Sequence, residues 1–104
     1  MIKVIEGLEL NKGADIQPLF LKLRSHAMTF PGFISAEHIR SAKGTSIEAL
    51  LYDWERLENW KAWEISQLRQ QLLKEAEGLF VSKPRITIYE VVPTSAWTNP
   101  GIKS

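Results

Sequence analysis

The chain has 104 residues, of which 44% are hydrophobic and 24% charged, and its formal net charge is +1 at pH 7. These values are typical of one soluble globular domain, and the balanced charge argues against binding of a nucleic-acid backbone. No cysteine is present, which excludes disulfides and thiolate metal sites, and the two histidines share no metal-binding spacing. No apolar run approaches the ~20 residues of a membrane span, and no signal-peptide pattern follows Met1, so we expect a cytoplasmic protein without membrane contact.

The first half of the chain predicts a strand, a helix and two further strands. Residues 2–10 form a strand with one dominant apolar row, and residues 11–13 form a turn. Asp15 is the expected N-cap of an amphipathic helix, which Pro31-Gly32 terminates. Residues 33–40 and 47–55 follow as strands, joined by the polar connection 41–46.

The second half predicts a broken helix and a last strand. Helical periodicity runs from Leu57 to about Glu77 with a break near Ser66, and Gly78 is the expected C-terminal cap. Its apolar stripe consists of Leu68, Leu72, Leu73 and Ala76. Residues 85–92 are rich in β-branched side chains and form the fourth strand. The tail 93–104 contains Trp97 but no periodicity, and we expect it either to wrap over a partner or to be partly disordered.

The element order β-α-β-β-α-β over residues 1–92 predicts a ferredoxin-like α+β domain with a four-stranded antiparallel sheet. Both helices then cover the same face of the sheet. The third and fourth strands nevertheless carry large side chains on both rows, so the other face needs a cover. A second copy of the chain is the simplest cover, and we expect a homodimer.

Several aromatic and turn positions carry a family resemblance. They are the Pro31-Gly32-Phe33 segment before the second strand, the Trp54-x5-Trp60-x2-Trp63 junction and the Ile88-Tyr89-Glu90-Val91 end of the last strand. This pattern over residues 1–92 resembles the antibiotic biosynthesis monooxygenase (ABM) domain family. The resemblance implies a dimeric α+β barrel with a pocket between each sheet and its helices. Some members of that family oxygenate phenols or hydroquinones with molecular oxygen and no bound metal or flavin.

The resemblance also implies roles for two helix residues. Asn59 and Trp63, at positions i and i+4, match an Asn-x3-Trp arrangement of the family. Asn59 would then hydrogen-bond an oxygen of the substrate, and Trp63 would line the ring site. Arg69 stands where the family members with the Asn-x3-Trp arrangement have a tyrosine. Leu73 stands near the haem-ligating histidine of the haem-degrading members, so haem degradation is not the leading interpretation.

The residues themselves suggest three further candidates. Glu6 interrupts the apolar row of the first strand; if it lies inside, it must pair with a cation or have a raised pKa, and it could act as a general base. A salt bridge at a sheet edge or dimer seam is the alternative. His38 could act as an acid or base near neutral pH, and Tyr52 could offer a hydroxyl to a substrate. The alternative for His38 is a plain surface or sheet-face histidine, and for Tyr52 it is ordinary packing on a strand, where tyrosine is common.

The resemblance therefore implies a cofactor-independent monooxygenase that acts on a phenolic or hydroquinone-type aromatic. The predicted catalytic residues are Asn59, Trp63 and Glu6, and the predicted substrate-binding residues are Trp63, His38 and Tyr52. A domain that binds a small apolar ligand without catalysis is the main alternative. A purely structural dimer, in which the tryptophans are all core, is a third.

Overall fold

We describe the protein from a computed structural model, in which residues 1–44 and 47–94 are placed. These residues form four strands and three α-helices, followed by a short 3-10 helix after the third. In chain order the elements are β1 (Ile2–Glu9), α1 (Gln17–Ala27), β2 (Phe33–Arg40), β3 (Ile47–Trp54), α2 (Leu57–Glu64), α3 (Gln67–Glu75), η1 (Glu77–Leu79) and β4 (Arg85–Glu90). The predicted tail beyond residue 94, with Trp97, lies outside the described residues.

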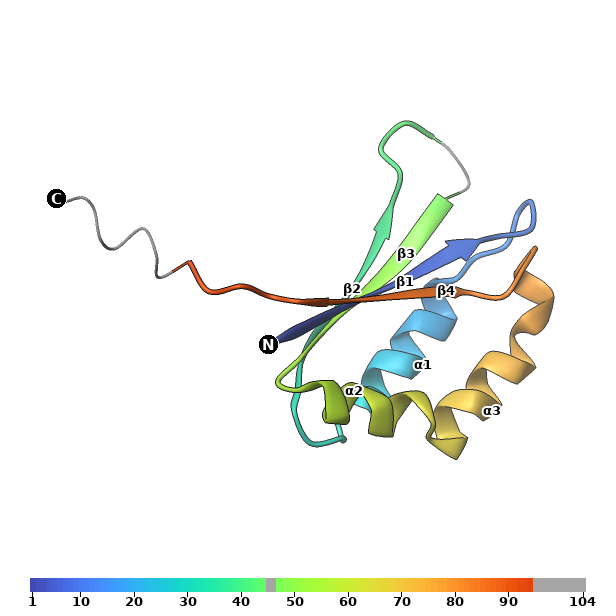
Figure 1. Cartoon of the computed structure of the whole chain (residues 1–104). Coiled ribbons are helices and arrows are strands. Elements are labelled where there is room, and N and C mark those ends of the chain that lie inside the picture. Colours follow the sequence, from blue (N-terminus) through green and yellow to red (C-terminus); the bar gives the residue numbers. More distant parts are fainter. Residues whose placement is uncertain (45–46, 95–104) are drawn as a thin grey trace, which may run out of the picture.

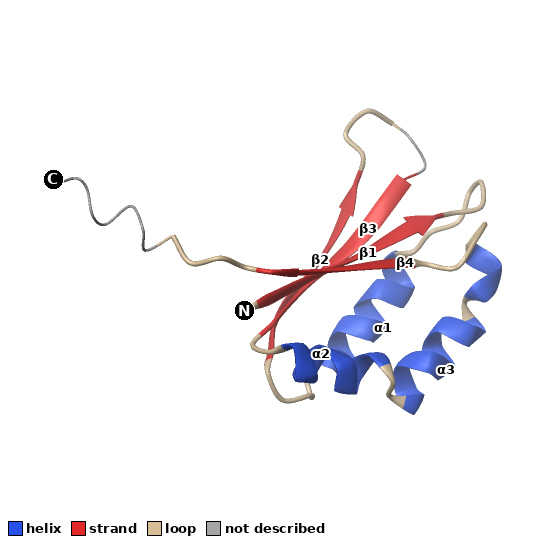
Figure 2. Cartoon of the chain, in the orientation of Figure 1, coloured by secondary structure: helices blue, strands red, loops and turns tan. Residues whose placement is uncertain are grey.

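The four strands form one antiparallel sheet in the order β2-β3-β1-β4. All three α-helices lie on the same side of this sheet, as Figures 1 and 2 show. The predicted ferredoxin-like α+β fold is therefore confirmed, with its second helix divided into α2 and α3. The predicted break near Ser66 is also confirmed, because the Ser66 side chain accepts a hydrogen bond from the backbone N–H of Arg69 and starts α3.

Strand register determines which side chains face the helices. Val4, Glu6 and Leu8 of β1 lie opposite Tyr52, Leu50 and Glu48 of β3. The core fills the layer between this row and the helices, and its largest fully buried side chains are Trp54, Trp60, Trp63 and Tyr52. Because alternate residues of a strand point to opposite faces, Ile5 and Leu51 face away from the helices.

Some predicted boundaries are wrong by a few residues. Gly78 does not cap α3, because α3 ends at Glu75 with Ala76 as its C-cap, and the chain tightens into η1 around Gly78. The N-cap position of α1 is Ile16, although the carboxylate of Asp15 still accepts a hydrogen bond from the Gln17 N–H. α1 ends at Ala27, before the Pro31-Gly32 turn, and β4 ends at Glu90.

Candidate functional site

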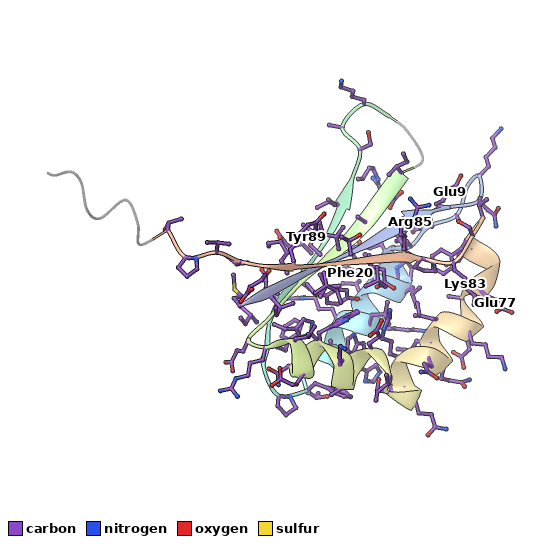
Figure 3. The ribbon with its side chains drawn as sticks, viewed as in Figure 1. Glu9, Phe20, Glu77, Lys83, Arg85 and Tyr89 are labelled. Carbon is purple, nitrogen blue, oxygen red and sulfur yellow. The ribbon has the colours of Figure 1, made fainter. Side chains whose placement is uncertain are left out.

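A cavity of about 520 Å³ lies between α3, strands β1 and β4 and the segment that leads into β4. Its apolar wall consists of Leu73, Phe80, Pro84 and Ile86. Its polar lining consists of Glu6, Arg69, Lys74, Glu77, Ser82 and Lys83. Figure 3 shows Lys83 and Glu77 where the end of α3 approaches the start of β4. A mostly apolar wall with a few convergent polar groups is the usual construction of a small-molecule site.

Glu6 reaches this cavity because of the register of β1. It lies opposite Leu50 of β3 and Ile86 of β4, on the row that faces the helices, and its side chain is fully buried. Burial raises the pKa of the Glu6 carboxyl above its ordinary value, while the Arg69 guanidinium acts in the opposite direction. A buried carboxylate with a raised pKa is a stronger base than an exposed one.

Arg69 is held in place from three sides. Its backbone N–H is bound by the Ser66 cap, and its Nη2 donates a 2.8 Å hydrogen bond to Oε2 of Glu6. Its guanidinium carbon lies 5.3 Å from the centre of the Trp60 ring, which is the geometry of a cation–π contact. Only 4% of the residue is exposed. Such a desolvated ion pair is a rigid polar end for the cavity.

Four buried polar atoms around this pair have no hydrogen-bond partner among the described residues. They are Oε1 of Glu6, Nε and Nη1 of Arg69, and the hydroxyl of Tyr52. Buried polar groups in folded proteins are nearly always hydrogen-bonded, because an unpaired one costs about 1–3 kcal/mol. Acceptors and donors that remain free beside a cavity are therefore suited to contact a ligand.

Tyr52 lies on β3 in the same buried layer. Its ring centre is 5.7 Å from that of Trp60, and the residue is fully buried. Burial, with the negative charge of Glu6 adding to it, raises the pKa of the Tyr52 phenol far above its ordinary value. The hydroxyl is consequently a neutral donor and not a base. Tyr52 is adjacent to the ion pair but is not part of the cavity lining.

The tryptophans form core contacts. Trp63 is fully buried and its ring meets Phe30 edge-on, with the ring centres 5.1 Å apart. Trp54 meets Phe33 in the same way at 5.5 Å. Neither tryptophan lines the cavity. Trp63 was predicted to bind the substrate ring, but it has no direct contact with this cavity.

Asn59 acts at the start of α2. Its Oδ1 accepts a 3.0 Å hydrogen bond from the backbone N–H of Arg56, which is half of a capping box. Its side chain also packs on the turn at Gly32, where a Cβ would lie 2.2 Å from Cγ of Asn59. The structure thus accounts for Asn59 as a cap, away from the cavity lining.

His38 lies on β2, which is separated from β1 by β3. Its two ring nitrogens contact Oε1 of Gln17 at 2.6 Å and Oε1 of Glu48 at 2.5 Å. Its ring centre is 5.7 Å from that of Phe20. The structure therefore brings Glu6 and Tyr52 together and leaves His38 in a separate polar cluster.

Sequence reasoning missed the role of Arg69. It assigned Leu68 to the apolar stripe of α3, yet Leu68 is 38% exposed and Arg69 is buried in its place. A signal was present, since Arg69 lies one turn before Leu72 and Leu73 on the core-facing side of the helix. A cation on an apolar stripe requires a buried anion, and Glu6 was the one acidic residue in the apolar row of the first strand.

The comparison with solved structures identifies the fold. A provisionally named antibiotic biosynthesis monooxygenase from Bordetella bronchiseptica superposes with a TM-score of 0.76 at 22% identity, over 88% of this chain and 97% of that one. This chain has the ABM fold. The fold resemblance predicted from the aromatic and turn positions is confirmed, and at this identity the match speaks for the fold alone.

Two further ABM-fold structures agree with this result. A provisionally named antibiotic biosynthesis monooxygenase from Deinococcus radiodurans gives a TM-score of 0.79 at 14% identity, covering 90% of this chain and 95% of that one. A variant of SnoaB, a cofactor-independent oxygenase from Streptomyces nogalater, gives 0.77 at 10% identity, covering 89% and 94%.

No family model and no curated protein sequence matches the chain. Within residues 1–44 and 47–94, no helix has the length and apolar character needed to cross a membrane. The same part of the chain contains no group of three or more His, Asp or Glu side chains that could hold a metal ion.

Proposed function

We propose that the protein is a homodimeric monooxygenase that oxidises a phenolic or hydroquinone-type aromatic with molecular oxygen and without a bound cofactor. The observation that carries this proposal is Glu6, a fully buried carboxyl with one unpartnered oxygen at the polar end of a mostly apolar cavity. The similarity of the fold to a cofactor-independent oxygenase supports it. Residues 1–92 form the catalytic domain in this proposal.

The chemistry requires a proton acceptor and a dry ring site. Oε1 of Glu6 removes the phenolic proton, and the free N–H groups of Arg69 stabilise the phenolate. The electron-rich phenolate then reduces oxygen. For a phenol with a free para C–H, uptake of one O2 gives the para-quinone and one water, so the substrate supplies all the electrons. The protein contributes proton transfer, orientation and exclusion of water.

The other predicted site residues take supporting roles. The Tyr52 hydroxyl is a neutral donor beside the ion pair and contacts substrate in this proposal only if the ligand reaches past the cavity lining. Trp63 maintains the helical layer behind the site, and Asn59 fixes the start of α2. His38 contacts substrate in this proposal only if the ligand extends along the sheet as far as β2.

Oxygen uptake with a panel of naphthols, anthrones and hydroquinones tests the proposal. We expect wild type to consume oxygen, and the Glu6→Gln/Arg69→Gln double variant to lose about 10²–10⁴-fold in turnover while still binding the phenol. The double variant removes both charges together, so no unpaired buried charge is created. Lys22→Gln, an exposed change on α1, is the matched control and should keep full turnover. Undiminished turnover in the double variant would remove Glu6 from the mechanism.

Binding without catalysis is the second candidate function. It is favoured by one specific observation: Asn59 is engaged as a helix cap and Trp63 in the core, so neither lines the cavity. Under this alternative the same phenols bind to wild type with saturation, and no oxygen is consumed. The oxygen electrode and a binding titration on the same samples therefore separate the two functions.

A further inference from the structure

The cavity beside Glu6 is more cationic than a site for a neutral phenol needs to be. Its lining contains three cations, Arg69, Lys74 and Lys83, against two carboxylates, Glu6 and Glu77. One carboxylate is already paired with one cation through the 2.8 Å Glu6–Arg69 hydrogen bond. The rest of the lining therefore carries one positive charge in excess.

The two lysines lie at the rim and have no ion-pair partner in the described part of the chain. Both lysines are exposed. Lys74 lies on α3 and Lys83 in the segment before β4, so each of these two walls of the cavity carries a lysine. Exposed cations at the mouth of an apolar cavity attract anions and raise their local concentration.

Arg69 supplies the second, independent observation. The residue is 4% exposed, and two of its nitrogens, Nε and Nη1, have no acceptor within the described residues. A single phenolic oxygen that donates to Oε1 of Glu6 cannot also satisfy both nitrogens. A carboxylate brings a full negative charge and two acceptor oxygens, and it binds a guanidinium along one edge, here Nε or Nη1 together with Nη2.

We infer that the ligand of this cavity is an aromatic hydroxy acid, with its hydroxyl toward Glu6, its carboxylate toward Arg69 and the rim lysines, and its ring on the apolar wall. This inference rests on the proposed function for the location of the phenolic group. The carboxylate shares Arg69 with Glu6 once it is bound. The positive charge of Arg69 then stabilises the Glu6 carboxylate less, and Glu6 accepts the phenolic proton more readily.

Calorimetric titration with 1-hydroxy-2-naphthoate and with 1-naphthol tests the inference, because the two probes differ only in the carboxylate. We expect wild type to bind the acid at least about tenfold more tightly than the naphthol. In Lys83→Gln this ratio should fall about threefold or more. In the Glu6→Gln/Arg69→Gln double variant it should fall to the part that the two rim lysines supply. Lys22→Gln should leave the ratio unchanged. The preference should also weaken in high salt, since the rim charges are exposed.

Equal binding of both probes by wild type would overturn the inference, and so would a preference that Lys83→Gln and the double variant both retain in full. Oxygen uptake is recorded on the same samples, so this outcome is separate from the proposed function. If naphthol is oxidised but the hydroxy acid does not bind more tightly than the naphthol, the oxygenase proposal is retained and the hydroxy-acid inference is rejected. A charge-dependent preference without oxygen uptake would support the hydroxy acid and reject the oxygenase.

Discussion

At the scale of single residues, the Glu6–Arg69 pair links stability to pH. The pKa of the Glu6 carboxyl is raised in the folded protein above its ordinary value of 4.5. Between these two values the folded state holds a proton that the unfolded state releases. The free energy of unfolding therefore falls as the pH rises through this window. Arg69 limits the loss, because its charge stabilises the ionised carboxylate.

Arg69→Met should expose this dependence. We expect it to lower the free energy of unfolding by about 3–5 kcal/mol at pH 8, because it removes the charge partner of the buried Glu6 carboxylate. The loss should be smaller at pH 5, because the lone carboxyl takes up a proton. Urea denaturation at both pH values measures the difference, and Glu6→Gln/Arg69→Met is the control with no carboxyl to titrate. An equal loss at pH 5 and pH 8 would mean that Arg69 does not lower the pKa of Glu6.

Tyr52 allows a second test at this scale, since its hydroxyl is buried without a hydrogen-bond partner in the described residues. Tyr52→Phe should change the free energy of unfolding by no more than about 1 kcal/mol in either direction, because no protein hydrogen bond is lost. Tyr52→Ala, which also removes the ring packed on Trp60, should cost about 3–5 kcal/mol. A loss above about 2 kcal/mol in Tyr52→Phe, measured by urea denaturation, would mean that the hydroxyl has a partner in solution.

At the scale of elements, the start of α2 depends on the contact between Asn59 and Gly32. Gly32 has a φ of +82°, and an added Cβ would lie 2.2 Å from Cγ of Asn59. Gly13 has a similar φ of +81° but open space around it. We expect Gly13→Ala to cost about 1–3 kcal/mol through backbone strain alone, and Gly32→Ala to cost clearly more.

Thermal or urea denaturation of both alanine variants, each also made in an Asn59→Ala background, completes a double-mutant cycle. In that background the excess cost of Gly32→Ala over Gly13→Ala should shrink, because the clashing side chain is gone. An excess that does not depend on Asn59 would show that the turn resists a side chain for another reason.

The same elements show how far sequence reasoning reaches. The strands and the break at Ser66 were predictable because alternation, turn residues and a serine cap are local signals. Asn59 has the spacing of the family pattern, yet its oxygen is used by Arg56 three residues earlier. The Glu6–Arg69 pair joins residues 63 positions apart, so it depends on strand register and helix docking, which no local pattern records. The C-terminal cap predicted at Gly78 was wrong, because a short 3-10 helix forms there in place of the cap.

At the scale of the whole molecule, the sheet has one face that the helices leave open. Ile5 and Leu51 lie opposite each other at its centre, and Ile39 and Tyr89, which are 44% and 52% exposed, lie toward its two edges. Figure 3 shows Tyr89 on the side of β4 away from the helices. The same face also carries charged residues, among them the ion pair of Lys3 and Asp53, so only its centre is apolar. An exposed apolar centre of this kind is more stable in water when a partner covers it, and the predicted homodimer would supply that cover.

Leu51→Glu tests that assembly. In a two-fold dimer each copy would place a new carboxylate in the covered face, so the substitution acts twice on one interface. We expect wild type to sediment as a dimer at about 50 μM and Leu51→Glu as a monomer with an unchanged far-UV spectrum. Ile65→Glu, at an isoleucine that is 71% exposed at the end of α2, is the matched control and should remain dimeric. A monomeric wild type, or a dimer that Leu51→Glu leaves intact, would place the cover of this face elsewhere.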